Sequence, residues 1–116
     1  MRYLLLLHGD AAAEAALGPD DRRAIVDEHL AFRRRLDSEG RLVRGDPLAG
    51  ADDAFAVRLL DDGSRLVTDG PFVETKEHLG SYYIVDCDGR DEAEALARDV
   101  PASPGLVVEV WPIAEF

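Results

Sequence analysis

The stretch Tyr3–Leu7, with the sequence YLLLL, places five large and mainly apolar side chains in a row near the start of the chain. It is too short for a buried helix, and the polar residues 8–10 close it, so it predicts a buried strand. Successive side chains of a strand point to opposite faces of the sheet. A strand that is apolar at every position needs cover on both faces, which places it at the centre of a sheet.

A first helix is predicted over Pro19–Glu39, after a polar and alanine-rich linker. Proline suits the first turn, two aspartates complement the positive end of the helix dipole, and Gly40 supplies a C-terminal stop. At about 100° per residue, His29 falls on the same narrow face as Ile25 and Phe32. We therefore expect the His29 ring to point toward the core.

The rest of the chain predicts shorter strands and one more helix. Strands are expected where aromatic and β-branched residues gather, a hairpin where Asp-Gly supplies positive φ angles, and a helix where apolar residues recur with helical spacing. The expected elements are a strand at Leu42–Val43 that breaks at Gly45–Pro47, a hairpin of Phe55–Leu60 and Arg65–Thr68, a strand at Tyr82–Val85, a helix around Ala93–Val100 and a strand at Leu106–Trp111.

This order of elements predicts an α+β fold, a ferredoxin-like βαββαβ layer with an inserted β-hairpin. Right-handed crossovers would place both helices on one face of a largely antiparallel sheet. The opposite face then has no helix to cover it. We expect that face to pack against a second copy of the chain, which predicts a homodimer.

Composition limits the class of protein. A chain of 116 residues that is 47% hydrophobic fits one domain, residues 1–116. Its formal net charge of -11 argues against nucleic acid or an anionic membrane as a partner. The lone Cys87 cannot form an internal disulfide, and we find neither a secretory signal nor a membrane span. These features predict a cytoplasmic protein that acts on a small molecule or a protein partner.

The segment Asp69–Gly80, with the sequence DGPFVETKEHLG, combines a rigid turn with the only lysine of the chain, Lys76. The pKa of a lysine ammonium responds to burial, whereas a guanidinium stays charged, so Lys76 is a candidate for binding an anionic substrate. The alternative is an exposed ion-pair network. Phe72 needs a pocket, in the core or at a dimer edge, where it could contact substrate.

The same segment closely resembles the signature of the DGPF group within the YCII-related family. The resemblance covers nearly the whole chain. It also includes Tyr3–Leu6, Gly40–Leu42, Gly45–Leu48, Tyr82–Asp86, Asp91–Ala93 and Val108–Pro112. It implies a dimeric α/β-barrel assembly of ferredoxin-like chains. It also implies an enzyme that pairs a helix histidine with an aspartate, and one relative is associated with dehydrochlorination of a chlorinated aromatic compound.

The resemblance places His29 on the family's histidine position. The family's aspartate precedes a proline near the end of the second helix, whereas here Val100 precedes Pro101 and Asp99 is one residue out of register. Asp69 is therefore the competing partner for His29. An aspartate before Gly-Pro also commonly bonds its own downstream backbone, which is the structural alternative for Asp69.

Three classes of function follow, of which the third is a protein that mainly builds a larger assembly through its dimer. The first is a cofactor-independent small-molecule enzyme that carries out proton transfer, isomerisation or elimination, with His29 as acid or base in a pocket between the first helix and the sheet. His8, at the end of the first strand, is a second candidate for the pocket, and His78 is expected to be solvated. The histidines lack the spacing of a metal site. The second class is a ligand-binding or regulatory protein, because DGPF-group genes often lie beside those of extracytoplasmic-function sigma factors.

Overall fold

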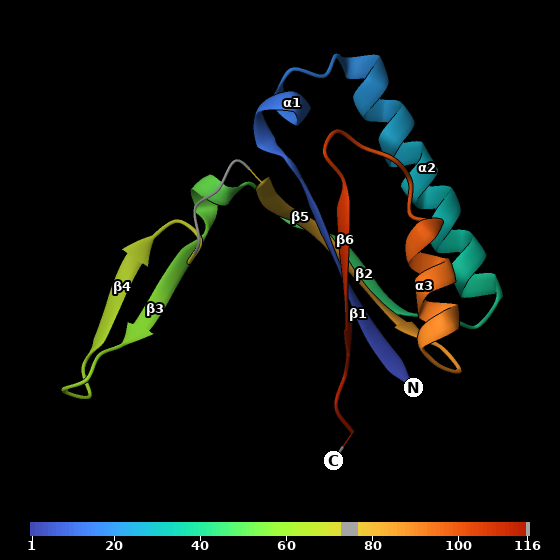
Figure 1. The fold of residues 1–116 in the computed structure, drawn as a ribbon. Coiled ribbons are helices and arrows are strands. Elements are labelled where there is room, and N and C mark those ends of the chain that lie inside the picture. The colour runs from blue at the N-terminus through green and yellow to red at the C-terminus, as the bar shows by residue number, and fades with distance from the viewer. Residues whose placement is uncertain (73–76, 116) are drawn as a thin grey trace.

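The computed structural model describes residues 1–72 and 77–115, and its main sheet has four antiparallel strands (Figure 1). They are β1 (Arg2–Asp10), β2 (Leu42–Pro47), β5 (Glu77–Asp86) and β6 (Val107–Pro112), in the spatial order β2-β5-β1-β6. The predicted central strand is central, since β1 pairs with β5 on one side and β6 on the other. This order agrees with a ferredoxin-like α+β fold.

Helices α2 (Pro19–Ser38) and α3 (Arg90–Arg98) lie on the same face of this sheet (Figure 1). The core forms between them and the sheet, and Leu5, Leu36 and Val85 are its largest fully buried side chains. Burial of each contributes about 1.5–3 kcal/mol. The two predicted helices are therefore confirmed, within a few residues at their ends.

A short helix, α1 (Ala11–Ala15), occupies the position predicted to be a linker. Asp10 caps it, because its carboxylate accepts a hydrogen bond of 3.0 Å from the backbone N–H of Ala13. An alanine-rich segment has high helix propensity. Here the Asp10 cap and the preceding strand β1 hold one helical turn in place. The linker prediction was wrong, and the difference matters because α1 carries Glu14.

The predicted break at Gly45–Pro47 was also wrong, because β2 continues through these residues to Pro47. β2 is an edge strand, and an edge position tolerates a proline that cannot donate a ladder hydrogen bond. Gly45 remains in the strand because the ring of Tyr83 covers it, at the place that a side chain would take. Gly45 therefore allows the Tyr83 ring to approach the backbone of β2 closely, and it does not form a turn.

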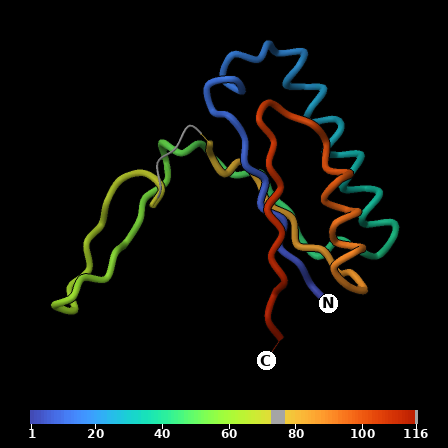
Figure 2. Tube along the Cα trace, viewed as in Figure 1, coloured from blue at the N-terminus to red at the C-terminus, as the bar shows by residue number. Residues whose placement is uncertain are grey.

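The predicted hairpin forms a separate two-stranded sheet that projects from the body of the molecule (Figure 2). A single 3₁₀ turn, η1 (Ala51–Asp53), leads into β3 (Phe55–Leu59), which pairs with β4 (Arg65–Asp69). The turn between them uses Gly63 at φ +84°. Three apolar side chains of the hairpin, Phe55, Leu59 and Val67, are more than 60% exposed.

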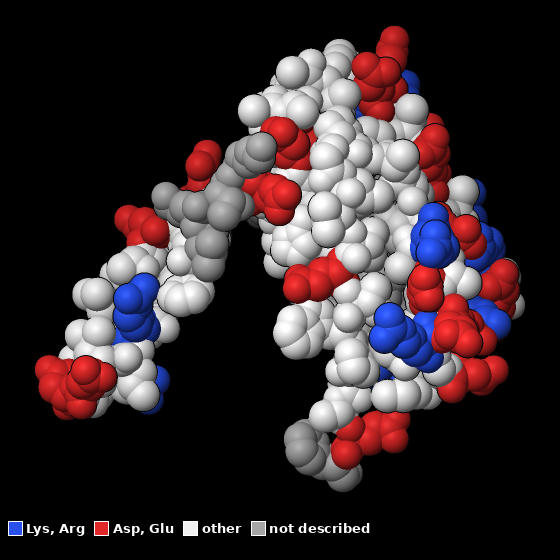
Figure 3. Space-filling view, in the orientation of Figure 1, with Lys and Arg blue, Asp and Glu red and all other residues white. Residues whose placement is uncertain are grey.

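The sheet face opposite α2 and α3 carries Leu4, Leu6 and Ile84 from the central strands, and Trp111 from β6. None of these four side chains is fully buried, and Trp111 is 55% exposed. Figure 3 shows acidic and basic side chains interspersed around α3, whereas the surface over β6 is largely uncharged. Among the described helices, none is long and apolar enough to cross a membrane.

Candidate functional site

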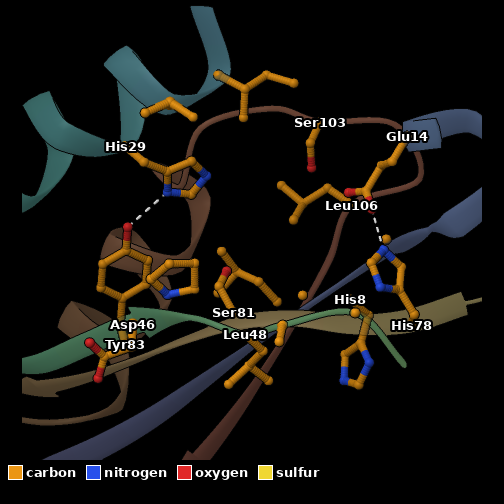
Figure 4. Close-up of a pocket in the computed structure, with 18 of the residues that line it drawn as sticks. His8, Glu14, His29, Asp46, Leu48, His78, Ser81, Tyr83, Ser103 and Leu106 are labelled. Atoms are coloured by element: carbon orange, nitrogen blue, oxygen red, sulfur yellow. Dashed lines mark hydrogen bonds and ion pairs between the residues drawn. The ribbon is translucent and has the colours of Figure 1, made fainter. Parts of the chain in front are cut away.

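A cavity of about 620 Å³ lies between α2 and the sheet, where the sequence predicted a pocket. Most of its lining is apolar, and Figure 4 shows the polar side chains that face it. The apolar lining residues include Ile25, Val26, Leu30, Leu48 and Leu106. A concave apolar site with a few convergent polar groups is the usual form of a small-molecule site.

His29 enters this cavity from α2 and forms a hydrogen bond with Tyr83 of β5. Its Nδ1 lies 2.7 Å from the Tyr83 hydroxyl oxygen, and its other ring nitrogen points into the cavity (Figure 4). A hydroxyl both donates and accepts, so it can accept from Nδ1–H and leave Nε2 with a free lone pair. In that tautomer His29 can take a proton from a molecule in the cavity.

Burial shifts the titration of both groups of this pair. Burial lowers the pKa of His29 below its ordinary value of 6.5, against a smaller opposing effect of the Glu28 charge. Burial also raises the pKa of the Tyr83 phenol above its ordinary value of 10.0. At neutral pH the histidine is therefore uncharged and the phenol keeps its proton.

Packing fixes the Tyr83 ring beneath His29. A Cβ atom at Gly45 would lie 2.6 Å from the Tyr83 ring, so only glycine leaves room for it. The Phe32 ring packs edge-on against Tyr83 with their centroids 5.4 Å apart. The Arg33 guanidinium donates to the Gly45 carbonyl beside the pair. The Tyr83 ring, which orients His29, is thus packed between the Gly45 backbone and the Phe32 ring and has little freedom to rotate.

A second histidine faces the same cavity because β5 contains an irregularity. In the pairing of β1 with β5, Leu7 lies opposite Ser81 but His8 lies opposite Leu79, so Gly80 is skipped. Such a bulge reverses which side chains face each side of the sheet. It turns His78 toward α2 and the cavity. The prediction that His78 is solvated was wrong, since its side chain is only 25% exposed.

His78 is paired with a carboxylate in the cavity. Its Nε2 contacts Oε2 of Glu14, a residue of helix α1 (Figure 4). A Cβ atom at Gly9 would lie 2.6 Å from the Glu14 carboxylate, so the glycine leaves the space that Glu14 needs. This pair was not predicted, because neither α1 nor the bulge at Gly80 was predicted.

The two aspartates predicted as partners of His29 lie elsewhere. Asp99 follows α3 and forms an ion pair of 2.9 Å with Arg35 at the surface. Asp69 ends β4 and lines a second hollow at the base of the hairpin. Within the described residues, the hydrogen-bond partner of the His29 ring is Tyr83. The structure therefore brings neither aspartate to this ring.

The predicted substrate-binding residues are also spread over the molecule. His8 lies at the edge of the cavity, but its ring points to the opposite face of the sheet (Figure 4). There its Nε2 lies 3.1 Å from a carboxylate oxygen of Glu109. Phe72 is 74% exposed beside Arg58, so it does not pack in the core of this chain, and the alternative of a dimer edge stays a prediction. Lys76 lies outside the described residues. No cluster of three potential metal ligands occurs within residues 1–72 and 77–115.

Together these observations define an α+β protein with two helices on one sheet face and a histidine-containing pocket beneath the longer helix. Comparison with known proteins supplies its family. The profile of the YCII-related domain matches residues 1–116, so the chain belongs to the YCII-related family. A protein of Rhizobium meliloti (strain 1021), itself described as uncharacterised, is 33% identical over 120 residues that span 100% of this chain and 94% of that protein. Membership of the DGPF group stays a prediction from the motif.

Proposed function

We propose that this protein is a cofactor-independent enzyme that transfers a proton to or from a small molecule, with His29 as the acid or base. The observation that carries the proposal is the placement of the His29 ring. One nitrogen is hydrogen-bonded to Tyr83 at 2.7 Å, and the other faces an apolar cavity of about 620 Å³. Isomerisation and elimination are reaction classes that such a base can start.

The surroundings of His29 suit a general base. The lowered pKa leaves the imidazole uncharged at neutral pH, so it is ready to accept a proton. The mainly apolar lining offers few polar groups that would compete with a substrate for the free nitrogen of His29. We assign the orienting role to Tyr83, because neither Asp69 nor Asp99 contacts the ring. The cavity lining favours an aromatic or other apolar substrate.

The test is turnover of 5-nitrobenzisoxazole, a flat and apolar compound that needs only a base. Removal of its ring C–H proton breaks the N–O bond and releases a coloured nitrophenolate. We expect saturable turnover by the wild type and a loss of about 100-fold or more in His29→Gln, the usual contribution of a general base. Glutamine keeps a polar side chain of similar reach, and circular dichroism checks that the fold is retained. Equal turnover by both proteins would contradict the proposal.

The assembly predicted for the family adds a second element to the proposal. An isolated two-stranded hairpin is marginally stable in water, and this one exposes Phe55, Leu59 and Val67. Together with the uncovered sheet face, these side chains support a homodimer. Mass determination by light scattering should give two copies. A stable monomer would contradict this part of the proposal.

A second candidate function is binding without turnover, which the apolar cavity also supports. In that case 5-nitrobenzisoxazole would bind, as seen by changes in the His29 ring resonances, but release no product. Partnership with an extracytoplasmic-function sigma factor stays a prediction from the family resemblance. The net charge of -11 is compatible with docking on a basic protein surface. Capture of a sigma factor by the purified protein, lost on charge reversal in α2, would support it.

A further inference from the structure

A second polar pair, His78 and Glu14, lines the same cavity as His29 but at its other end. Figure 4 shows the rings of His29 and Tyr83 on one side, the second pair on the other, and apolar side chains such as Leu106 between them. The proton transfer proposed for His29 does not use the second pair. That pair can therefore contact a part of a bound molecule that His29 does not reach.

The sheet sets the distance between the two ends of the cavity. In β1, Leu5 lies opposite Tyr83 and Gly9 lies opposite His78. At about 3.3 Å per residue, the step along β1 from Leu5 to Gly9 is about 13 Å long. No single functional group can therefore contact both pairs. The cavity volume of about 620 Å³ is within the range of about 300–1,000 Å³ that is usual for sites of drug-sized ligands, so one elongated molecule can extend from end to end.

The fold holds the second pair in place. The bulge at Gly80 turns His78 toward the cavity, and the backbone N–H of Leu48 donates a hydrogen bond of 2.9 Å to the Gly80 carbonyl. Gly9 lacks the Cβ atom that would lie 2.6 Å from the Glu14 carboxylate. The side chains of His78 and Glu14 are only 25% and 29% exposed. A hydrogen bond to this partly desolvated pair is stronger than one formed in water.

The carboxylate of Glu14 sets the hydrogen-bonding character of His78. Nε2 of His78 contacts Oε2 of Glu14, and the other ring nitrogen, Nδ1, faces the cavity (Figure 4). A carboxylate only accepts hydrogen bonds, so Nε2 carries the proton of the neutral imidazole and Nδ1 keeps its lone pair. A carboxylate partner also makes that lone pair more basic, as it does in histidines that bind metals. His78 therefore offers the bound molecule an acceptor.

We propose that Nδ1 of His78 anchors the substrate by accepting a hydrogen bond from a hydroxyl group at the end away from the reacting C–H bond. The substrate class is then a neutral, mainly apolar molecule of bicyclic size, with a hydroxyl group at one end and an acidic C–H bond at the other. This proposal rests on the proposed role of His29 as the base, because it names the substrate class of the same pocket. His78 binds and orients the substrate, and its hydrogen bond transfers no proton.

The other polar groups of the cavity do not supply this preference. The hydroxyls of Ser81 and Ser103 rotate and can either donate or accept, so they do not select a donor. The Arg33 guanidinium already donates to the Gly45 carbonyl. An anionic group at the His78 end would lose its hydration and be repelled by the neighbouring carboxylate. A neutral hydroxyl group avoids both costs.

The test compares three compounds of the same bicyclic frame. The first, 2-naphthol, donates a hydrogen bond, 2-methoxynaphthalene only accepts one, and naphthalene does neither. Each is titrated into the protein at pH 7, and its dissociation constant is read from NMR shifts of the cavity residues. We expect the wild type to bind 2-naphthol on the order of tenfold more tightly than either of the other compounds, the size of one charge-assisted hydrogen bond. Addition of 2-naphthol should also shift the Nδ1 resonance of His78.

Three variants show which residue makes the preference. His78→Phe keeps a flat ring without the acceptor, so the preference for 2-naphthol should disappear while naphthalene still binds. Gly9→Ala places a methyl group against the Glu14 carboxylate and should reduce the preference by displacing it, with His78 itself unchanged. Glu109→Gln is the matched control, since Glu109 pairs with His8 on the opposite sheet face. It should leave the preference as in the wild type.

Binding and turnover separate this proposal from the one for His29. Equal affinity of the wild type for the three compounds would overturn the anchoring role of His78, whatever the turnover of 5-nitrobenzisoxazole. So would tighter binding of 2-methoxynaphthalene than of 2-naphthol, or a preference for 2-naphthol that His78→Phe retains. A wild type that prefers 2-naphthol but does not turn over 5-nitrobenzisoxazole would overturn the role of His29 and leave His78 as the anchor of a binding site.

Discussion

Replacement of Tyr83 by phenylalanine removes one hydroxyl group and leaves the core almost unchanged. Tyr83 is only 3% exposed, and its ring packs edge-on against Phe32 at 5.4 Å, a contact that phenylalanine keeps. The lost interaction is the hydrogen bond of 2.7 Å to His29 Nδ1. The variant therefore separates the orienting hydrogen bond from the packing around it.

The expected stability loss is small. A hydrogen bond of this kind contributes a net amount of about 1 kcal/mol, and the half-buried Nδ1 can find water through the cavity. For a chain of 116 residues, that loss corresponds to a fall in Tm of about 4 °C. The effect on turnover of 5-nitrobenzisoxazole should be comparable in energy, on the order of tenfold, because His29 loses the group that fixes its tautomer.

Thermal unfolding and steady-state kinetics measure the two effects on the same samples. Tyr82→Phe is the matched control, because the Tyr82 hydroxyl lies 2.6 Å from Asp46 and on the opposite face of the sheet from His29. It should leave turnover unchanged. If Tyr83→Phe turned over 5-nitrobenzisoxazole as fast as the wild type, the orienting role of Tyr83 would be refuted. A stability loss above about 3 kcal/mol would show that the hydroxyl serves the fold.

Three further predictions concern the core, the strand glycine and pH. Leu5→Ala empties a fully buried position in the central strand and should lower the free energy of unfolding by about 2–5 kcal/mol in urea titration. In Gly45→Ala the added methyl group overlaps the Tyr83 ring, which should lower the free energy of unfolding by about 1–3 kcal/mol. This variant should also reduce turnover of 5-nitrobenzisoxazole, an effect that a change in stability alone would not produce. Because burial lowers the pKa of His29 below 6.5, the unfolded chain takes up its proton first as the pH falls, so stability is lost between pH 6.5 and the folded-state pKa. Urea titrations at pH 7 and pH 5 should show this loss in the wild type and a smaller one in His29→Gln.

Much of the fold could be predicted from sequence because the signals were local. The apolar run of β1, the caps and spacing of α2 and the Asp-Gly turn of the hairpin each lie within a few residues of the element that they define. The order of these elements then restricts the topology strongly. His29 was found in the same way, since helical spacing places it beside Phe32 whatever the rest of the chain does.

The partners in the site could not be predicted because they depend on contacts between distant elements. Tyr83 reaches His29 only because Gly45, in another strand, leaves room for its ring. His78 faces the cavity only because the ladder skips Gly80, and a bulge has no clear sequence signal beyond the glycine itself. Because Asp99 is out of register with the family's aspartate, Asp69 was predicted instead, and it lies at the end of β4 in the projecting hairpin.

The central claim is that His29 is an uncharged base in an apolar pocket. Its most direct test follows the His29 ring resonances by NMR and the turnover of 5-nitrobenzisoxazole over the same pH range. We expect the rate to fall on acidification with the same midpoint as protonation of His29, and that midpoint to lie below 6.5. A rate that does not follow this ring, or a His29 midpoint at or above 6.5, would contradict the account.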